Sequence, residues 1–504
     1  MSGKIRRQSI ISSLVIYIGF AIGFLNTFFF GKEGFFLSEE YGLAQLFVKL
    51  SALLASLGTL AMPSYILKFY PYYRDRLKPD KNEMLTLALF VGVIGFLIVF
   101  AFGYVFEHIV VRKYSANSPL FVDYYYWVYA LGFGLSIYNI LEAYCQSLQR
   151  PVFATFVKEV EWRVLVLILI VLYITGVIRD FSLFIKLYAL TYWGIAITMF
   201  IYLMYIGAIK FTFRISFVTK RIRKILMRFT SFVYFALVIS MISQVFDGLV
   251  IGSVVEDGLT NLAIFFVAEL MTSVIQAPQR SVVNVSVAHL AEAWKYKDLP
   301  KVNRIYVRSS INLLIASLFL FCLIALNFVD AIYFFGLKPE FALGFTAFVV
   351  MGLTRVVDLG TGVNAQVIAT SRYWRFELWS GIILLIIMLP LSYIFTKWYG
   401  IVGPPIAGLI SYSVYNGIRI YFLWKKFRLF PFSAKTIYNI LLAAVVYGIT
   451  YFVFKDMQGF WALAGRSLLF AALYLPGVFY LKLSPDVQPV LDSLLQRISF
   501  RKKK

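Results

Sequence analysis

The sequence predicts an all-α polytopic membrane protein with about 14 transmembrane helices and both termini in the cytoplasm. Of its 504 residues, 61% are hydrophobic and only 14% are charged, far outside the range of soluble domains. The apolar residues gather in segments of about 20 residues, the length that crosses a ~30 Å hydrocarbon layer as a helix. The basic residues lie mainly in alternate loops, as expected for a membrane protein of fixed orientation.

Fourteen apolar segments are long enough to span a membrane. A membrane β-barrel is excluded because its strands alternate polar and apolar residues, whereas residues 164–174 are apolar on every face. The first segment is too long for a signal peptide and no small-residue cleavage site follows it. The fifth begins either at residue 159 or just after Pro151. The predicted spans are 10–30, 42–66, 84–106, 123–148, 159–178, 181–207, 229–254, 259–288, 309–335, 341–368, 376–396, 399–424, 436–454 and 459–481.

Lysine and arginine are distributed unevenly between the two sides of the membrane. With the N-terminus in the cytoplasm, the loops on that side hold 34 of the 48 basic residues, and the loops on the other side hold 7. This asymmetry predicts the orientation. The net charge of +23 is therefore attributed to topology and to attraction toward anionic membrane lipids, and no nucleic-acid partner is predicted.

The remaining 7 basic residues fall inside the predicted spans. A charge in hydrocarbon costs several kcal/mol unless it faces a wet or paired interior, so a functional site is expected among these residues. They are Lys49, Arg163, Lys186, Arg280, Arg355, Arg419 and Arg466.

The chain is predicted to form two pseudo-symmetric six-helix lobes. The most basic internal loop follows the sixth span and is interpreted as a linker. A weak internal repeat supports this division, since Tyr-Arg-Asp at 73–75 and Tyr-Lys-Asp at 296–298 are offset by 223 positions, and many transporters consist of two repeats. The predicted division is 1–209 for the N-terminal lobe, 210–228 for the basic cytoplasmic linker, 229–424 for the C-terminal lobe, and 425–504 for two further helices and a basic cytoplasmic tail.

Arg280 is the first candidate for binding an anionic group. It follows Pro278 in the eighth span, and a proline removes a backbone hydrogen bond and often marks a bent helix beside a cavity. The guanidinium offers a fork of donors to phosphate oxygens. The alternative is an arginine that extends to the cytoplasmic interface or pairs with a neighbouring carboxylate.

Arg355 is the second candidate. It lies about 14 residues from the outer start of the tenth span, or ~21 Å, which is too far for its side chain to reach the outer surface. Asp358 follows at i+3, so this arginine either forms a structural pair with it or contacts a substrate or ion. Gly360 and Gly362 allow close packing or local unwinding nearby.

Lys49 is the third candidate. It lies about seven residues from the outer end of the second span, so its side chain either extends to the interface or lines a cavity. The second and eighth spans correspond in the proposed repeat. Under the cavity interpretation, Lys49 and Arg280 are therefore expected on opposite walls.

Glu159 and Arg163 are spaced i, i+4, which predicts an ion pair within one helix; a position at the mouth of a cavity is the alternative. Lys186, Arg419 and Arg466 lie nearer the helix ends and are expected to extend to the interface.

Acidic residues inside the spans could carry H⁺ or Na⁺, or could neutralise a nearby cation. Asp247 and Glu269, on adjacent spans, are the first candidates for ion coupling; Glu142 and Asp358 also lie inside spans.

No catalytic centre, metal site or cofactor is predicted. The chain has no Walker-type phosphate loop and no nucleophile elbow, and its only histidines are His108 and His289. No outward loop is longer than residues 107–122, which leaves no room for an extracytoplasmic catalytic domain. We therefore expect that the chain is not an enzyme.

Three stretches resemble the Wzx-type polysaccharide flippases of the multidrug/oligosaccharidyl-lipid/polysaccharide exporter superfamily. They are FYPYYRD at 69–75 after Pro63, residues 278–298, and GIVGPPIAG at 400–408. The resemblance implies alternating-access transport of a polyprenyl-diphosphate-linked oligosaccharide to the outer leaflet of the bacterial inner membrane, for surface polysaccharide or O-antigen (lipopolysaccharide) synthesis. The implied partners are this lipid-linked anionic oligosaccharide, membrane lipids and glycan-assembly proteins.

The resemblance also implies that Arg280 matches a cavity arginine of the related lipid II flippases. Those proteins carry an arginine inside the first helix, which this chain lacks. A surface glycan is therefore expected as cargo rather than a peptidoglycan precursor.

Two other functions compete with this one. A cation-coupled multidrug exporter of the same superfamily should rely on carboxylates in its cavity, whereas Lys49, Arg280 and Arg355 occupy central positions here. A membrane glycan polymerase or ligase needs a large outward loop, which is absent. The sequence leaves open whether H⁺, Na⁺ or the membrane potential drives transport.

Overall fold

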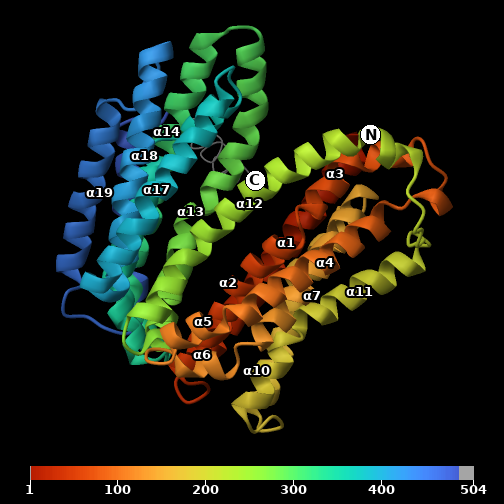
Figure 1. Cartoon of the computed structure of the whole chain (residues 1–504). Coiled ribbons are helices and arrows are strands. Elements are labelled where there is room, and N and C mark those ends of the chain that lie inside the picture. Colours follow the sequence, from red (N-terminus) through yellow and green to blue (C-terminus); the bar gives the residue numbers. More distant parts are fainter. Residues whose placement is uncertain (1, 487–504) are drawn as a thin grey trace, which may run out of the picture. The chain divides into compact units, whose positions relative to one another are not determined.

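Helices make up the regular structure of residues 2–486, the part of the chain that our computed structural model describes (Figure 1). Each predicted span is helical over most of its length, because an apolar segment in lipid must satisfy its backbone hydrogen bonds internally. Within this part of the chain, 11 helical segments are long and apolar enough to cross a membrane. The chain is thus a multi-pass membrane protein, while the count of 14 spans and the orientation stay predictions.

The chain divides into two compact units, residues 1–263 and 264–504, and the boundary falls near the start of helix α13. The first unit contains α1 to α12. The bounds of its elements are α1 Ser2–Gly31, α2 Ser38–Gly58, α3 Met62–Arg74, η1 Pro79–Lys81, α4 Met84–Val105, α5 Glu107–Tyr114, α6 Pro119–Asp123, α7 Trp127–Ser147, α8 Pro151–Phe156, η2 Val157–Glu161, α9 Trp162–Ile174, α10 Phe181–Ala189, α11 Thr191–Tyr205 and α12 Phe217–Val254.

The second unit contains most of α13 and all later helices. The bounds of its elements are α13 Gly258–Lys295, α14 Leu299–Phe334, η3 Pro339–Gly344, α15 Phe345–Gly360, α16 Asn364–Ala369, α17 Trp374–Tyr399, η4 Gly400–Val402, α18 Gly403–Phe427, α19 Ala434–Val453 and α20 Phe460–Tyr480. The predicted basic tail lies largely outside the described residues.

The first unit is built around α2 and α7. Helix α7 packs against α2, α3, α4 and α11, and α2 also contacts α12 (Figure 1). Tyr65, Tyr73 and Tyr138 are fully buried in this core. The Tyr65 hydroxyl donates to the Tyr73 hydroxyl at 2.8 Å, because a buried hydroxyl requires a hydrogen-bond partner.

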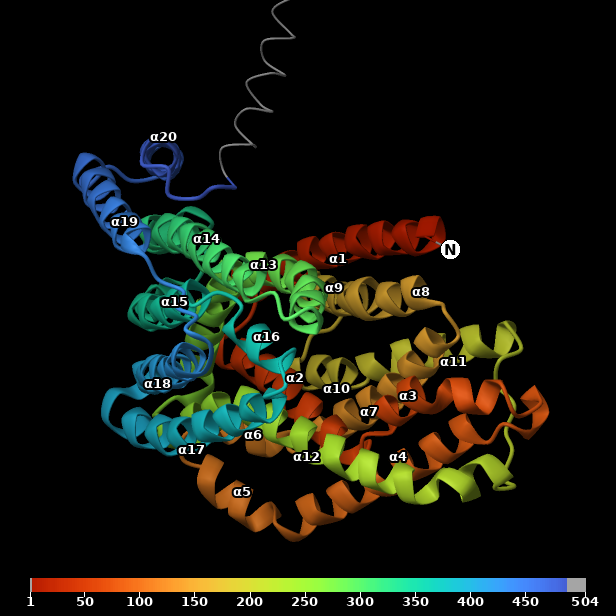
Figure 2. The same cartoon turned by 90° about the horizontal axis from the view of Figure 1, so that it is seen from above.

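In the second unit, α17 and α18 form an antiparallel pair, and α15 packs against α18 (Figure 2). Helix α14 contacts α15, α19 and α20, which joins α19 and α20 to the rest of the unit. Buried side chains of α14, α19 and α20 form one hydrophobic cluster. Pro300 and Pro404 are the second residues of α14 and α18, where the missing proline N–H costs little.

Two predicted spans are interrupted. The segment predicted as 42–66 ends as a helix at Gly58 and resumes at Met62, with Leu60 and Ala61 at positive φ. The segment predicted as 341–368 breaks between Gly360 and Asn364. Gly362 has a φ of +71° there, a conformation that glycine adopts without strain.

Much of the segment predicted as a basic linker, 210–228, is helical. Helix α12 already begins at Phe217, with Ser216 as its N-cap. Glu83, which is buried, accepts hydrogen bonds from the Ser216 amide at 2.9 Å and the Thr219 hydroxyl at 2.7 Å. A carboxylate is favourable at a helix N-terminus, so Glu83 anchors the start of α12.

The two copies of the repeat motif lie in different environments. Tyr73 is fully buried in α3, whereas Tyr296 follows α13 and is 69% exposed. Asp298 is the N-cap of α14, and Asp75 follows the last turn of α3. The short matches therefore do not correspond to one shared local structure.

Candidate functional site

Arg280 lies in the second half of α13, two residues after the internal Pro278. Its side chain is exposed, and it has no hydrogen-bond or ion-pair partner among the described residues. The nearby Gln276 and Gln279 bond to each other at 3.1 Å rather than to the arginine. The predicted alternative of a neighbouring carboxylate partner is therefore not seen in this part of the chain.

Arg355 lies in the last turns of α15 and is half-buried. It too has no partner among the residues that the structure describes, so the predicted pair with Asp358 is not formed. Asp358 instead accepts a hydrogen bond at 3.0 Å from Asn416 Nδ2 on α18. The i, i+3 spacing permits a pair, but Asp358 is held by another helix.

Helices α13 and α15 are neighbours and run in the same direction. A Cβ added at Gly344 would lie 3.1 Å from Ile264 Cγ2, and one at Gly352 would lie 3.5 Å from Ile275 Cδ1. Arg280 follows Ile275 by about 7.5 Å of helix rise, and Arg355 follows Gly352 by about 4.5 Å. The backbone positions of the two unpaired arginines thus lie at nearly the same level on adjacent helices of one unit.

The helical backbone is interrupted close to the level of the two arginines. Residues 361–363 separate α15 from α16, as the predicted unwinding at Gly360 and Gly362 allows. The Ser310 hydroxyl donates to the Gly360 carbonyl at 2.5 Å, and the Val363 amide donates to the Ser309 hydroxyl at 3.2 Å. Helix α14 thus supplies partners for the freed backbone groups, as irregular structure within a membrane requires.

Arg419 is a buried residue that the sequence led us to place at the interface. It is only 2% exposed. Its Nη2 donates to Glu377 Oε1, its Nε to Ser380 Oγ at 3.2 Å, and its Nη1 to Asn364 Oδ1 at 3.4 Å. The guanidinium also stacks 3.6 Å from the ring centroid of Tyr415. The expectation of an arginine extending to the interface was wrong here.

Arg419 belongs to a continuous polar network between α16, α17 and α18. Asn364 Nδ2 donates to Asn416 Oδ1 at 2.7 Å and to Thr361 Oγ1 at 2.9 Å, which links the network to Asp358 through Asn416. A buried hydrogen-bond network of this kind fixes the helices relative to one another.

Arg466 is likewise buried, at 9% exposure, and was also expected at the interface. It donates to Asp330 on α14, to the Phe454 carbonyl at 3.0 Å and to the Met457 carbonyl at 2.8 Å. Because Phe454 is the C-cap of α19, this arginine satisfies carbonyls that the helix end leaves open. It joins α19 and α20 to α14.

In the first unit, Lys49 and Asp247 lie on α2 and α12, two helices in contact. Both side chains are half-buried, and each interacts with another residue. Glu269 on α13 is also half-buried and partnered. The roles in substrate or ion binding predicted for these residues stay predictions.

The ion pair predicted for Glu159 and Arg163 is present, with Arg163 Nη1 at 2.6 Å from Glu159 Oε2. It lies against α1, because a Cβ at Gly19 would come within 2.4 Å of the Glu159 carbonyl and one at Gly23 within 2.9 Å of Arg163 Nε. The pair therefore supports close packing of two helices. Its predicted place at a cavity mouth stays a prediction.

The segment that carries Glu159 is a π-helix, η2, and holds a second ion pair. Lys158 Nζ lies 3.1 Å from Glu142 Oε2 on α7, and Gln146 Nε2 donates to Glu142 Oε1 at 3.2 Å. Single π-turns often mark functional positions in helices. No sequence pattern indicated this π-turn. Its ion pair could not be predicted either, because Lys158 and Glu142 lie on different helical segments.

Within residues 2–486, no group of histidine, cysteine, aspartate and glutamate side chains is arranged to hold a metal ion.

The fold is that of known transporters. The lipid II flippase MurJ in an inward closed conformation matches with a TM-score of 0.72 at 16% identity, over 94% of this chain and 99% of that one. An inward-facing multidrug resistance MATE family transporter of the MOP superfamily matches with a TM-score of 0.62 at 16% identity, over 83% and 98%.

A third solved structure, a MOP superfamily transporter from Pyrococcus furiosus, matches with a TM-score of 0.55 at 16% identity, over 84% of this chain and 95% of that chain. No protein-family model and no curated protein sequence matches the chain. At these identities the similarity shows a shared fold, which is common to lipid flippases and drug transporters.

Proposed function

We propose that the protein is a transporter that flips a polyprenyl-diphosphate-linked oligosaccharide from the cytoplasmic to the outer leaflet, by alternating access and without enzymatic activity. One observation carries the proposal: Arg280 and Arg355 lie unpaired at one level on adjacent helices among the described residues. Unpaired guanidinium groups at membrane depth suit an anionic cargo.

The charge of the cargo accounts for the two cations. A diphosphate carries about two negative charges that must leave water, and preset guanidinium groups reduce this cost through bidentate, charge-assisted hydrogen bonds. Arg419 and Arg466 cannot take this role because their donors are already used. Lys49, on α2 of the first unit, is proposed as a further cation that contacts the anionic cargo.

The membrane potential can contribute to the driving force. With the cell interior negative, outward movement of an uncompensated charge gains about 2.3 kcal/mol per 100 mV, or about 4 to 5 kcal/mol for a dianion. Counter-ion movement would cancel part of this gain. H⁺ or Na⁺ coupling would use Asp247, Glu269 or Asp358, the acids inside the spans.

The cellular setting of the proposal follows from the charge pattern and the resemblance. We place the protein in the bacterial inner membrane with both termini in the cytoplasm, 14 spans in two lobes plus two helices, and a surface polysaccharide or O-antigen precursor as cargo. The distribution of basic residues between loops supports the orientation.

The first test deletes the gene for the protein in its host cell and determines on which leaflet the lipid-linked oligosaccharide accumulates. Accumulation on the cytoplasmic leaflet is expected. Unchanged glycan together with altered drug sensitivity would support a cation-coupled multidrug exporter, the second candidate, which the MATE-like fold favours.

The second test replaces Arg280 by Ala and, separately, by Lys. We expect Arg280→Ala to abolish delivery to the outer leaflet and Arg280→Lys to recover only part of it, because lysine cannot form a bidentate contact. Arg375→Ala is the matched control, since Arg375 is an exposed arginine of the same unit. Normal delivery with Arg280→Ala would remove this residue from the mechanism.

A further inference from the structure

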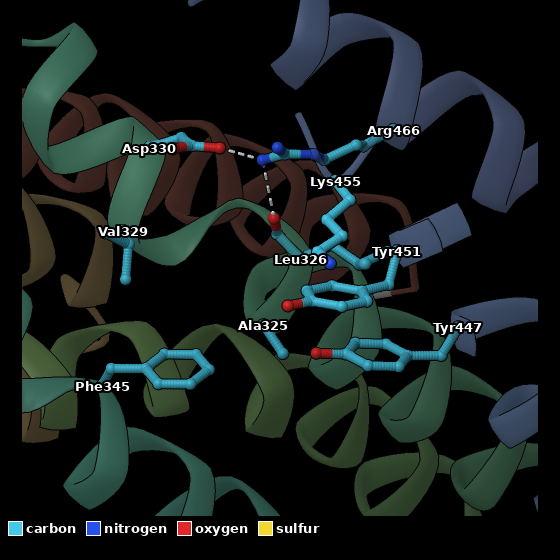
Figure 3. Close-up of a pocket in the computed structure, with 9 residues that line it drawn as sticks. All are labelled: Ala325, Leu326, Val329, Asp330, Phe345, Tyr447, Tyr451, Lys455 and Arg466. Atoms are coloured by element: carbon cyan, nitrogen blue, oxygen red, sulfur yellow. Dashed lines mark hydrogen bonds and ion pairs between the residues drawn. The ribbon is translucent and has the colours of Figure 1, made fainter. Parts of the chain in front are cut away.

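A cavity of about 470 Å³ lies in the second unit where α14, α15, α19 and α20 meet (Figure 3). A neighbouring hollow of about 500 Å³ shares Val329 and Asp330 with it and reaches the loop at Gly459. Both lie near helix ends, because α14 ends at Phe334 and α19 at Val453. Since the ends of membrane-spanning helices lie near the lipid head groups, we place the cavity at that level.

One side of this cavity is apolar. Ala325, Leu326 and Val329 of α14 and the ring of Phe345 line it. Figure 3 shows the Phe345 ring across the cavity from Tyr447 and Tyr451. Such a surface suits a hydrocarbon chain.

The only carboxylate that lines the cavity in the described structure is already neutralised. Asp330 accepts from Arg466, whose other donors reach backbone carbonyls of Leu326, Phe454 and Met457. This pair offsets the charge of Asp330, so the cavity has no unpaired negative charge.

The polar groups that stay free are two tyrosine hydroxyls and one ammonium group, and each of them can donate a hydrogen bond. The rings of Tyr447 and Tyr451 stack with centroids 6.4 Å apart and planes 6° apart, and both hydroxyl groups point into the cavity (Figure 3). Lys455 follows α19 and also lines it. Neither the hydroxyls nor the ammonium group has a hydrogen-bond partner among residues 2–486.

We propose that this cavity binds the phosphate head group of a bilayer phospholipid, with an acyl chain against the apolar side. Three free donors and one net positive charge match a phosphate monoanion. A neutral sugar is a poorer match because it would leave the ammonium charge of Lys455 without a counter-charge. The proposal concerns a bound membrane lipid and does not depend on what the protein transports.

The test is native mass spectrometry of the purified full-length protein with phosphatidylglycerol, diacylglycerol or polyprenyl phosphate. Wild-type protein should retain phosphatidylglycerol and release diacylglycerol, which has the same chains without phosphate. Lys455→Met should weaken retention about tenfold, the loss expected for one charge-assisted hydrogen bond, and Tyr447→Phe with Tyr451→Phe about fivefold.

Lys397→Met is the matched control. Lys397 is an exposed lysine near the end of α17 that lies 4.9 Å from the Tyr393 ring and does not line the cavity. Its loss should leave retention unchanged, and melting midpoints should show that every variant is folded. Equal retention of diacylglycerol, retention of polyprenyl phosphate alone, or equal effects of Lys455→Met and Lys397→Met would each overturn the proposal.

Discussion

Two pairs of arginines in the second unit contrast sharply. Arg419 and Arg466 are 2% and 9% exposed and use their donors on carboxylates, carbonyls and amides. Arg280 and Arg355 have no partner among the described residues. Depth in a span therefore does not reveal whether an arginine is paired; the number of occupied donors separates the two pairs. This difference should appear in the free energy of unfolding of variants at these residues.

The largest loss of stability is expected for Arg419→Met. It leaves the Glu377 carboxylate near α18 without its cation, while Glu377 Oε2 already has no partner in the described structure. Removing one member of a buried pair costs about 3 kcal/mol. Thermal unfolding in detergent measures this loss. The double variant Arg419→Met with Glu377→Gln should recover part of it, and an unchanged midpoint would contradict the assigned structural role.

Arg466→Met should cost about 2 kcal/mol, because the side chains of Arg466 and Asp330 are partly exposed, at 11% and 20%. The loop at 454–459 should also loosen, since two of its carbonyls lose their donor. Limited proteolysis of this loop checks the second effect. Lys482→Met, at an exposed lysine of the same unit, is the control; equal cleavage in both variants would exclude a restraint by Arg466.

Glu159→Gln should cost only about 0.5 kcal/mol, as expected for a partly exposed i, i+4 pair. The two side chains are 25% and 20% exposed. A double-mutant cycle with Arg163→Met measures the pair energy directly. A coupling energy as large as that of Arg419 with Glu377 would place this pair with the structural arginines.

The smallest effect on stability is expected for Arg280→Ala and Arg355→Ala, at no more than about 0.5 kcal/mol each. Neither substitution leaves a described partner without its hydrogen bond. Their effect should fall on transport instead, measured as delivery of lipid-linked glycan at equal protein abundance. Marked unfolding of either variant would show that a partner exists and would remove the contrast on which the proposed function rests.

The helices were predictable because an apolar run in lipid has one way to satisfy its backbone. The interruptions within two of the predicted spans were harder to predict. Gly362 marked one of them, but Leu60 and Ala61 have positive φ without any glycine. Tertiary packing imposes that conformation, and local sequence does not reveal it.

The candidate cations were found by position alone, and position did not reveal their partners. Arg419 pairs with Glu377, 42 positions away, and Arg466 with Asp330, 136 positions away. Only spacings within one helix turn are visible in a sequence, which is why the pair of Glu159 and Arg163 was predictable. The cavity that gathers Lys455 and the two tyrosines forms only where α14 and α19 pack together, so no sequence motif indicated it.

The pair of Asp330 with Arg466 also constrains how the chain is made. Translation completes α14 before it begins α20, and 136 positions separate the acid from its counter-ion. Asp330 must therefore enter the bilayer ahead of the residue that neutralises it. A helix that leaves the ribosome later completes the charge balance of an earlier one, so a chain that stops before α20 retains an acid at the end of α14 without its described cation.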